Sequence, residues 1–461
     1  MQAALSFTEL LELATHAERQ LKGDGVLSLV LPIEGLDPLV HLPQLEGDDC
    51  FQFLWDKSPG LSLAASGRTN HFELSGPRRF ELAQHFIDSS LSQLVCAPEI
   101  VPPHARPRIL LAFSFFDTVL SIKDKLPAIQ AVLPRWQLSR ENGKACWLRL
   151  QVNAGSGTIA RQLAEELWLK AESLVAFSKT AKENSYETTY STAKVIHSSV
   201  WQEDYINPAR RGLELVDNNE LHKLVIAVRQ YLILEEPIKP LQLLHKLRAE
   251  QRGSCRFLWQ IDKGDSFFGA SPERLLVVKQ GQLRSDALAG TSLAGEGDSQ
   301  LLQSDKDRYE HELVVSEIKK VLYKNGMFPH HPSRPYLTRH GDLMHLHTPI
   351  TADLNGQSAL SLAKALHPTP AVAGLPQKDA INWIRSLENF ERGNYAAPIG
   401  WVDNHGDSEL RVAIRSARQQ NHQLELTAGA GLVSGSIVEK ELQEIALKLA
   451  IMHKQLNLPI T

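Results

Sequence analysis

The sequence predicts an α+β fold built on antiparallel sheets. In the second half of the chain, strand-like segments come in pairs separated by short polar turns, Lys263-Gly264-Asp265 and Gln280-Gly281-Gln282, as hairpins require. Helical segments stand between groups of strands instead of following single strands. That grouping favours antiparallel sheets over a doubly wound parallel sheet.

The first 200 residues alternate between helix-like and strand-like segments, judged from the spacing of their apolar residues. Helices are predicted at Leu5–Leu21 and Thr158–Thr180, and strands at Val26–Leu31, Phe51–Trp55, Ile109–Phe113 and Ala145–Val152. The polar stretch Thr180–Ser199 predicts a surface connection that closes the N-terminal region.

The second half contains a β-rich segment, four hairpin strands and three helices. The β-rich segment is Leu221–Leu234, the strands are Cys255–Ile261, Phe267–Ser271, Leu275–Lys279 and Gln282–Asp286, and the helices are Lys239–Gln251, Asp305–Tyr323 and Ile437–Gln455. His345 and His347 share one face of a further possible strand. Because a third ligand is not obvious, hydrogen-bonding histidines are expected there and not a metal site.

Composition excludes several classes of protein. The 461 residues carry 49 Lys and Arg against 53 Asp and Glu, which gives a formal net charge of -4. That balance disfavours a nucleic-acid binder, and 43% hydrophobic residues disfavour a disordered chain. The four cysteines form no CxxC pair, so neither a disulfide scaffold nor a zinc knuckle is expected. With no signal peptide or membrane span in the sequence, a cytoplasmic protein is expected.

The glycine-rich stretch Ala428–Gly435 does not match a nucleotide-binding fingerprint. GxGxxG would need glycine where Ser434 stands, and no GK[ST] follows. Two interpretations stay open for it. It is either an ordinary glycine turn or a segment whose bare backbone N–H groups hold a carboxylate.

Two helices carry carboxylates that continue an apolar stripe. Glu310 lies one turn before the apolar stripe of its helix, and Glu441 and Glu444 flank the stripe of the last helix. Solvated helix residues, and an ordinary i,i+4 pair between Glu444 and Lys448, are one interpretation. A Mg²⁺ site shared between the two helices is the other, since Mg²⁺ prefers a few carboxylates completed by water and substrate oxygen.

Lys223 and Glu273 each allow a surface and a catalytic interpretation. Lys223 opens an apolar strand, where a lysine usually snorkels from an edge. Glu273 follows a corner marked by Pro272, where a surface carboxylate is the ordinary case. If buried, the two side chains would suit a base and an acid, because burial disfavours the charged form of each.

Taken in order, these motifs resemble the chorismate-utilising enzymes. The blocks that carry the resemblance are Lys223–Arg229, Phe268–Leu275, Ala287–Thr291, Glu310–Val315, His345–Leu346, Pro368–Gly374, Tyr395–Gly400, Ile414–Ala417 and Ala428–Gly431, followed by Glu441 and Glu444. The resemblance implies large antiparallel sheets packed together and flanked by helices. Length alone predicts about three domains. The resemblance instead implies a chorismate-binding catalytic region at 201–461, with 1–200 as a variable N-terminal part of the same fold.

The resemblance also implies a role for each matched residue. Lys223 would activate water and Glu273 would protonate the leaving hydroxyl. The Mg²⁺ ligands would be Glu310 and Glu444, with Glu441 beside them through a metal-bound water. The substrate-binding residues would be Gly290, Thr291, His345, Ala371, Tyr395, Arg415, Gly429, Ala430, Gly431 and Lys448. Among them, Tyr395, Arg415 and the glycine-rich backbone would hold the enolpyruvyl carboxylate, and His345 would contact the ring region.

Within the family, the isochorismate synthases are the most similar subgroup. Lys223 favours water as the nucleophile, and the small Ala371 stands where anthranilate and salicylate synthases have Thr. The extra methyl of Ala397 departs from the Tyr-Ala-Gly pattern of many members. The implied reaction is the hydroxyl exchange of chorismate. The long N-terminal part favours menaquinone synthesis over siderophore synthesis as the pathway. A monomer without an amidotransferase partner is expected. Salicylate synthase, the ammonia-using synthases and a non-catalytic chorismate-binding subunit are the alternatives.

Overall fold

The computed structural model describes residues 5–23, 25–57, 59–118, 126–154, 160–183, 194–295 and 298–457. The described residues form 20 strands that are hydrogen-bonded into one continuous sheet. Every strand pairing is antiparallel except that of β1 with β4. The predicted α+β class with large antiparallel sheets is therefore confirmed.

The bounds of the elements are as follows. The helices are α1 Phe7–Gln20, α2 Pro38–His41, α3 Arg79–Ser92, α4 Ala160–Glu183, α5 Gln202–Asp217, α6 Pro240–Glu250, α7 Asp298–Gln303, α8 Asp305–Lys324, α9 Ala359–Leu366, α10 Gln377–Leu387 and α11 Val438–Gln455, with short 3₁₀ turns at Leu42–Leu45 and Pro103–Ala105. The first ten strands are β1 Val26–Ile33, β2 Gln52–Asp56, β3 Leu61–Leu74, β4 Leu94–Ala97, β5 Arg108–Phe113, β6 Ile129–Glu141, β7 Cys146–Asn153, β8 Val195–Ser198, β9 Lys223–Leu234 and β10 Cys255–Asp262. The others are β11 Asp265–Ser271, β12 Arg274–Lys279, β13 Gln282–Leu293, β14 Tyr336–His340, β15 Leu343–Asp353, β16 Gly374–Leu375, β17 Pro398–Asp403, β18 Ser408–Val412, β19 Ser416–Gln420 and β20 Gln423–Leu432.

Strand β6 joins two wings of the sheet. One edge of β6 pairs with β3, and the other edge pairs with β5 near its start and with β7 further along. The first wing continues from β3 through β2, β10, β11, β19 and β20 to β9. The second continues from β5 through β17, β18, β12 and β13 to β15. Strands of the first 200 residues thus pair directly with strands of the second half, β2 with β10 and β5 with β17.

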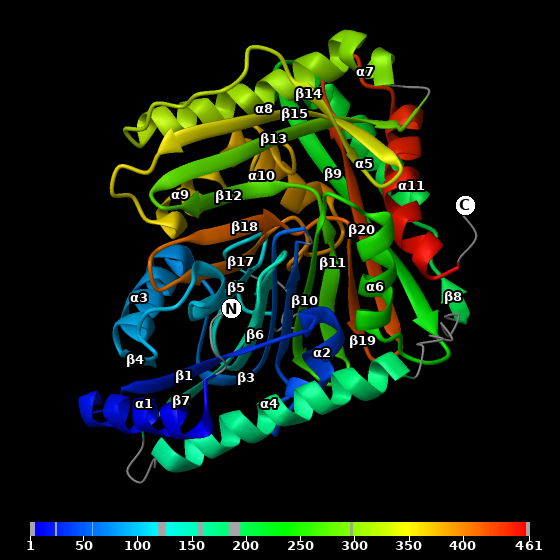
Figure 1. Ribbon diagram of the computed structural model, residues 1–461. Helices are drawn as coiled ribbons and strands as arrows, with labels where there is room; N and C mark the ends of the chain where they lie inside the picture. The colour runs from blue at the N-terminus through cyan, green and yellow to red at the C-terminus, as the bar shows by residue number, and fades with distance from the viewer. Residues whose placement is uncertain are drawn as a thin grey trace.

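The two wings pack face to face around an aromatic core. Phe53, Trp55 and Trp259 of the first wing are buried together with Leu110 and Trp401 of the second. Helices lie outside this layer, as Figure 1 shows. Helices α1 and α4 lie along the N-terminal strands, α8 lies along β13 and β15, and α5 and α11 cover β9 and β20. This packing places α8 and α11 at the end of the molecule where β9 begins and β13 ends.

Local sequence accounts for the helix starts next to the site and at the N-terminus. Ser6 and Glu9 form a reciprocal capping box at the start of α1. Ser304 caps α8 by accepting a hydrogen bond from the backbone N–H of Asp307. That cap fixes where α8 begins, and therefore places Glu310 in the second turn of the helix.

Most predicted elements are present within a few residues of their predicted bounds. The prediction for Thr180–Ser199 was partly wrong, because α4 continues to Glu183 and Val195–Ser198 forms β8 beside β9. Residues 184–193 of that stretch, and the predicted helix start at 158–159, lie outside the described residues. No helix in the described part of the chain is long and apolar enough to cross a membrane.

Candidate active site

A cavity of about 750 Å³, including its opening to solvent, lies where the two wings meet α8 and α11. Its walls come from β9 and β20 of one wing and from β13 and β15 of the other. Most of the residues predicted from the sequence line this one cavity: Glu273, Gly290, Thr291, Glu310, His345, Ala371, Tyr395, Arg415, Gly429, Gly431, Glu444 and Lys448.

Lys223 and Glu310 form a buried ion pair beside this cavity. Lys223 is the first residue of β9 and is fully buried, and Glu310 of α8 is 8% exposed. The Lys223 Nζ lies 2.7 Å from Glu310 Oε1. Burial alone would raise the pKa of Glu310, but Lys223, Lys306 and Lys448 outweigh it and hold the pKa below its usual value. A snorkelling edge lysine and a solvated helix start are therefore both excluded.

Gly431 leaves room for this ion pair. A Cβ atom at position 431 would lie 2.6 Å from Glu310 Oε1 and 2.9 Å from the Lys223 Cε. Both separations are closer than real Cβ atoms approach other heavy atoms. A side chain at position 431 would therefore displace the ends of both side chains. The glycine-rich stretch is a strand up to Leu432 and a turn at Ser434 and Gly435.

The backbone of β20 alternates in direction across the site. The N–H of Ala227, the partner of Gly429, donates to Glu388 Oε1 at 2.8 Å and so does not point at β20. In an antiparallel pair this means that the N–H and C=O of Gly429 also point away from the partner strand. The Gly429 carbonyl indeed accepts from Lys448 Nζ at 2.8 Å. Gly429 and Gly431 thus present backbone groups beyond Ser416, the first residue of β19 and the partner of Thr427.

Ala430 differs from its two neighbours. Its side chain is fully buried in the main hydrophobic core, on the opposite face of β20 from the cavity. Its partner Ile226 is next to Ala227, so by the same alternation its backbone groups are used in the ladder with β9. The sequence grouped Ala430 with Gly429 and Gly431, and the structure separates it from them.

Glu273 occupies the Pro272 corner between β11 and β12 and is 4% exposed. Its Oε1 accepts a hydrogen bond from Thr369 Oγ1 at 3.3 Å. Burial raises the pKa of Glu273 to about 7, against the opposing effects of the Thr369 bond and of Lys223, Lys448 and Arg415. The surface interpretation is thus excluded, and this carboxyl group can carry a proton near neutral pH.

Arg415 and His345 hold each other in the cavity wall. A guanidinium can only donate, so the contact between Arg415 Nη2 and His345 Nε2 makes Nε2 the acceptor. His345 must then carry its proton on Nδ1, which donates to the Gly290 carbonyl at 2.9 Å. Burial, aided by Arg415, holds the pKa of His345 well below its usual value, so the ring is neutral. His345 therefore orients Arg415, as a hydrogen-bonding histidine and not a metal ligand.

Arg415 keeps one donor free for a ligand. It adopts a left-handed backbone conformation, with a φ of 52°, that non-glycine residues rarely take. Its Nη1 is buried and has no hydrogen-bond partner among the described residues. A buried unpaired guanidinium nitrogen is costly. A carboxylate in the cavity would satisfy it, and Tyr395 stands in the same wall.

Each of the three predicted metal-binding carboxylates is paired with a lysine. Besides Glu310 with Lys223, Glu444 pairs with Lys448 at 2.7 Å, which is the predicted i,i+4 pair, and Glu441 pairs with Lys306 at 2.5 Å. Burial, together with Glu444, raises the pKa of Glu441. Glu441 does not line the cavity. Within the described ranges, no group of three or more His, Cys, Asp or Glu side chains is arranged around a metal position.

Glu310 and Glu444 nevertheless fit Mg²⁺. They bring hard oxygen donors from two helices to one cavity. That ion binds through one or two carboxylates and keeps several waters or substrate oxygens. Two cavity carboxylates are therefore a suitable donor set, and no third protein ligand is needed.

The family profile described as chorismate binding enzyme matches residues 11–457 of the sequence. This chain belongs to the chorismate-binding enzymes. The match includes the N-terminal part, for which the sequence showed no comparable motif. It also explains why strands from both halves of the chain share one sheet.

Relatives of this chorismate-binding enzyme include several isochorismate synthases. A salicylate biosynthesis isochorismate synthase of Pseudomonas aeruginosa is 40% identical over 245 residues, 51% of this chain and 51% of that protein. Isochorismate synthase MenF of Bacillus subtilis is 33% identical over 264 residues, 56% of each chain. The chain thus spans only about half the length of these relatives.

Solved structures resemble this chorismate-binding enzyme over nearly its full length. The menaquinone-specific isochorismate synthase MenF from Escherichia coli aligns with a TM-score of 0.76 at 25% identity, covering 97% of this chain and 99% of that one. Anthranilate synthase component I from Streptococcus pneumoniae aligns with a TM-score of 0.69 at 18% identity, covering 91% and 97%. The second likeness shows a shared fold.

Sequence reasoning missed three residues that shape the site of this chorismate-binding enzyme. Thr369 bonds Glu273, Lys306 pairs with Glu441, and the buried Arg392 supports two residues of the cavity wall from behind. Arg392 donates to the backbone carbonyls of Val225 and Val372 and pairs with Glu388 at 2.5 Å. The i,i+4 spacing of Glu388 and Arg392 was the one sign in the sequence that these two residues could pair. The same spacing is common in exposed ion pairs, so it did not show that this pair is buried.

Proposed function

We propose that this chorismate-binding enzyme is an isochorismate synthase. It would convert chorismate reversibly to isochorismate, with water attacking C2 while the C4 hydroxyl leaves and the double bonds shift between them. The observation that supports this most is a buried acid near a buried lysine. Glu273 lines the cavity with a pKa of about 7, and Lys223 is close enough to lower that pKa.

The two ionisable groups would divide the proton transfers. In its ion pair with Glu310, Lys223 is an ammonium, so it would first release that proton. As a neutral amine, its Nζ would then accept the proton of the attacking water, and Glu273 would give its proton to the departing hydroxyl oxygen. Matched acid and base groups with an acid pKa near the working pH favour such a pair. When bound by Glu310 and Glu444, Mg²⁺ would neutralise the ring carboxylate of the substrate.

The enolpyruvyl carboxylate would bind on the opposite wall. The free Nη1 of Arg415 offers a charge-assisted hydrogen bond, and His345 fixes the direction of that guanidinium. The backbone groups of Gly429 and Gly431, together with Tyr395, complete the proposed carboxylate site. The chain as a whole has a net charge of -4 and does not attract the chorismate dianion. Positive charge inside the cavity would instead bind it.

The pathway and the setting of the enzyme are also proposals. The likeness to menaquinone-specific MenF over 97% of the chain supports menaquinone synthesis, whereas the similarity to a Pseudomonas relative named for salicylate biosynthesis supports a different pathway. Ala371 favours release of isochorismate over its further conversion to salicylate. We propose a cytoplasmic monomer without an amidotransferase partner, in keeping with its four free cysteines.

The decisive experiment follows the products from chorismate and Mg²⁺ by NMR, with and without ammonium. Isochorismate without pyruvate release supports the proposal. Salicylate with pyruvate would indicate a salicylate synthase, and an amino product only with ammonium would indicate an ammonia-using synthase. Tight binding of chorismate without turnover would indicate a binding subunit.

Two substitutions test the assigned roles. Lys223→Ala and Glu273→Gln should each abolish turnover, because each removes one of the two proton-transfer groups. Circular dichroism should show both variants folded. Substantial turnover in either variant would remove the corresponding role.

A further inference from the structure

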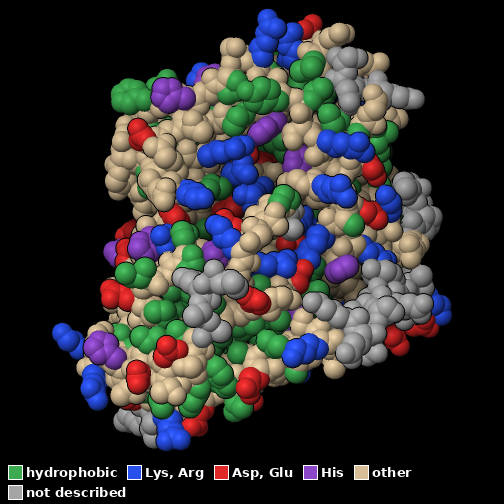
Figure 2. Space-filling model, in the orientation of Figure 1, with side chains coloured by type: hydrophobic (Ala, Val, Ile, Leu, Met, Phe, Trp, Pro, Cys, Tyr) green, Lys and Arg blue, Asp and Glu red, His purple; other side chains and the backbone are tan. Residues whose placement is uncertain are grey.

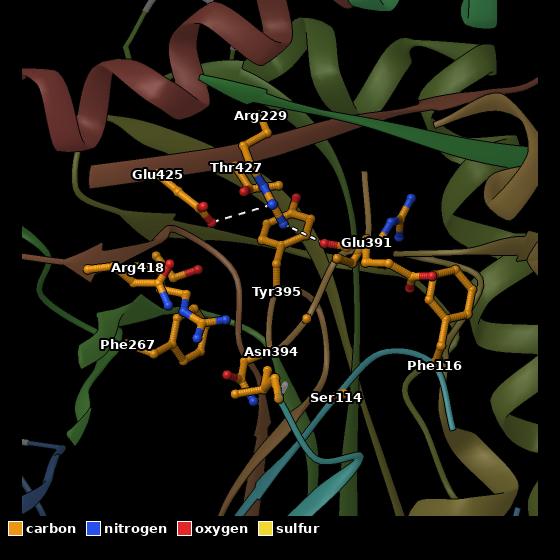
Figure 3. Close-up of a pocket in the computed structure, with 15 residues that line it drawn as sticks. Ser114, Phe116, Arg229, Phe267, Glu391, Asn394, Tyr395, Arg418, Glu425 and Thr427 are labelled. Atoms are coloured by element: carbon orange, nitrogen blue, oxygen red, sulfur yellow. Dashed lines mark hydrogen bonds and ion pairs between the residues drawn. The ribbon is translucent and has the colours of Figure 1, made fainter. Parts of the chain in front are cut away.

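A second cavity lies next to the active-site cavity, and we call it the arginine pocket. Its described walls include Arg229, Arg418, Glu425, Phe116 and Tyr395 (Figure 3). Its volume is about 660 Å³ including its opening, which is close to the 750 Å³ of the active-site cavity. The arginine pocket is therefore a recess that opens to solvent beside the active-site cavity.

The two cavities follow the same face of the sheet. Arg229 of β9 pairs with Thr427 of β20, and Arg418 of β19 pairs with Glu425. Alternate residues of a strand share a face, so Glu425 and Thr427 lie on the same face as Gly429, further along β20. Tyr395 and Thr427 line both cavities. The arginine pocket is thus the continuation of the active-site groove beyond these two side chains.

The arginine pocket contains donors that the protein uses only in part. Arg229 donates to the Glu391 carbonyl at 2.5 Å and, over a longer distance of 3.5 Å, to the Tyr231 hydroxyl. Its ion pair with Glu425 is 3.4 Å long, and its buried Nε has no hydrogen-bond partner among the described residues. Arg418 is 3.3 Å from Asp265. Charge-assisted N–H···O bonds are normally about 2.7–2.9 Å long. Both guanidinium groups therefore have capacity for an anionic ligand.

Aromatic rings supply the apolar part of the pocket. In Figure 3, Phe267 lies near Arg418 and Tyr395 near Arg229, while Phe116 is on the far side of the pocket. Apolar walls with a few convergent polar groups are typical of small-molecule sites. We propose that the arginine pocket binds a small ring carboxylate, with the carboxylate against Arg229 and Arg418 and the ring among the aromatic side chains. This site is distinct from the catalytic one and shares its Tyr395 wall.

The test uses bromo-isophthalate, a ring dicarboxylate that cannot react. Calorimetric titration of the full chain should show two binding events per molecule. Arg418→Met should weaken one event by about tenfold or more, because a hydrogen bond to a charged group is lost. Arg418→Lys should weaken it less. Arg210→Met removes the same charge from an exposed position of α5 and should change neither event. In wild-type crystals, the anomalous signal of bromine should lie in the arginine pocket as well as in the active-site cavity.

Three results would overturn the proposal. These are a single binding event with bromine only in the active-site cavity, two events that Arg418→Met leaves unchanged, and bromine in the arginine pocket without a second calorimetric event. If Arg418→Met lowers the melting temperature, the Arg418→Lys titration and the wild-type bromine positions decide instead. Because the probe is unreactive, failure here is distinct from failure of the proposed isochorismate synthesis, which the product assay measures separately.

Discussion

Three ionisable side chains of this site are buried, and each depends on a few neighbouring groups. Lys223, Arg415 and Glu273 are nearly inaccessible to water, so each charge depends on a few named neighbours. Such groups are costly to bury unless they are paired or neutral. Their neighbours therefore decide whether burying each group is tolerated.

The first prediction concerns the pH dependence set by Glu273. As an acid, Glu273 must carry its proton, and its pKa is about 7 in the free protein. We expect kcat/KM for chorismate to fall as the pH rises through about 7, because the protonated fraction then declines. A pH profile at saturating Mg²⁺ measures this limb.

Thr369→Val provides the matched variant for this profile. The Thr369 hydroxyl donates to Glu273 and favours its charged form, so removing the hydroxyl should raise the pKa of Glu273 further. The alkaline limb should then move to higher pH in the variant. A limb that stays in place or moves to lower pH would show that another group controls it.

The second prediction concerns Lys306 and the metal. Lys306→Met leaves the buried carboxylate of Glu441 without its partner, which should cost roughly 1–3 kcal/mol of unfolding free energy without Mg²⁺. Because the competing ammonium is gone, added Mg²⁺ should stabilise the variant more than the wild type. Urea denaturation with and without MgCl₂ measures both effects.

Lys320→Met is the control, since Lys320 pairs with Glu317 on the exposed side of α8 and is 59% exposed. Its stability should match the wild type with and without Mg²⁺. If Lys306→Met responded to Mg²⁺ no more than this control, Lys306 would have no influence on the metal site.

At the scale of elements, β20 decides which groups reach the cavity. Alternation along the strand directs Gly429 and Gly431 into the site and Ala430 into the core. The sequence predicted that these glycines belong to the site. It did not predict that Ala430 between them faces the core. It depends on register with β9, which only the folded sheet defines.

The third prediction tests this element. A methyl group at position 431 would meet both Lys223 and Glu310, so Gly431→Ala should displace their ion pair. We expect kcat/KM to fall about 100-fold, as displacement of catalytic groups by about 1 Å can cause. Steady-state kinetics and circular dichroism measure activity and folding.

Gly47→Ala is the matched control, because nothing lies within 4 Å of a Cβ at that position. It should leave kinetics and folding unchanged. Normal kinetics in Gly431→Ala would mean that the ion pair tolerates displacement and that its geometry does not limit the reaction.

Predictability from sequence also varies by element. Strong apolar periodicity gave α1, α8, α11 and most hairpin strands near their observed bounds. Helices α3, α5 and α10 were not predicted, and β3 and β6 were missed although they are long. Helices α5 and α10 are strongly amphipathic, so their apolar stripes are present in the sequence, whereas the stripe of α3 is weak. Strands β3 and β6 are buried on both faces over much of their length, which removes a simple alternation. In the same way Lys223, Glu273 and Glu310 looked like surface residues until the sheet around them was known.

Across the whole molecule, charge is unevenly placed. The net charge is only -4, yet Figure 2 shows Lys and Arg side chains gathered across the middle of one face, between the part that carries α8 and the N-terminal part. Net charge describes the average and not the local field. Near-neutral composition is thus compatible with a chain that receives an anionic substrate.

The last prediction concerns the unity of the sheet. Strand β2 covers the edge of β10, β5 covers the edge of β17, and both contribute to the aromatic core between the wings. Removing residues 1–200 would expose two strand edges and open that core, so the fragment 201–461 should aggregate or lack cooperative unfolding. The full chain should unfold in one calorimetric transition with equal calorimetric and van't Hoff enthalpies. Two separate transitions, or a soluble 201–461 fragment that unfolds cooperatively, would show instead that the second half folds independently of the strands that flank it here.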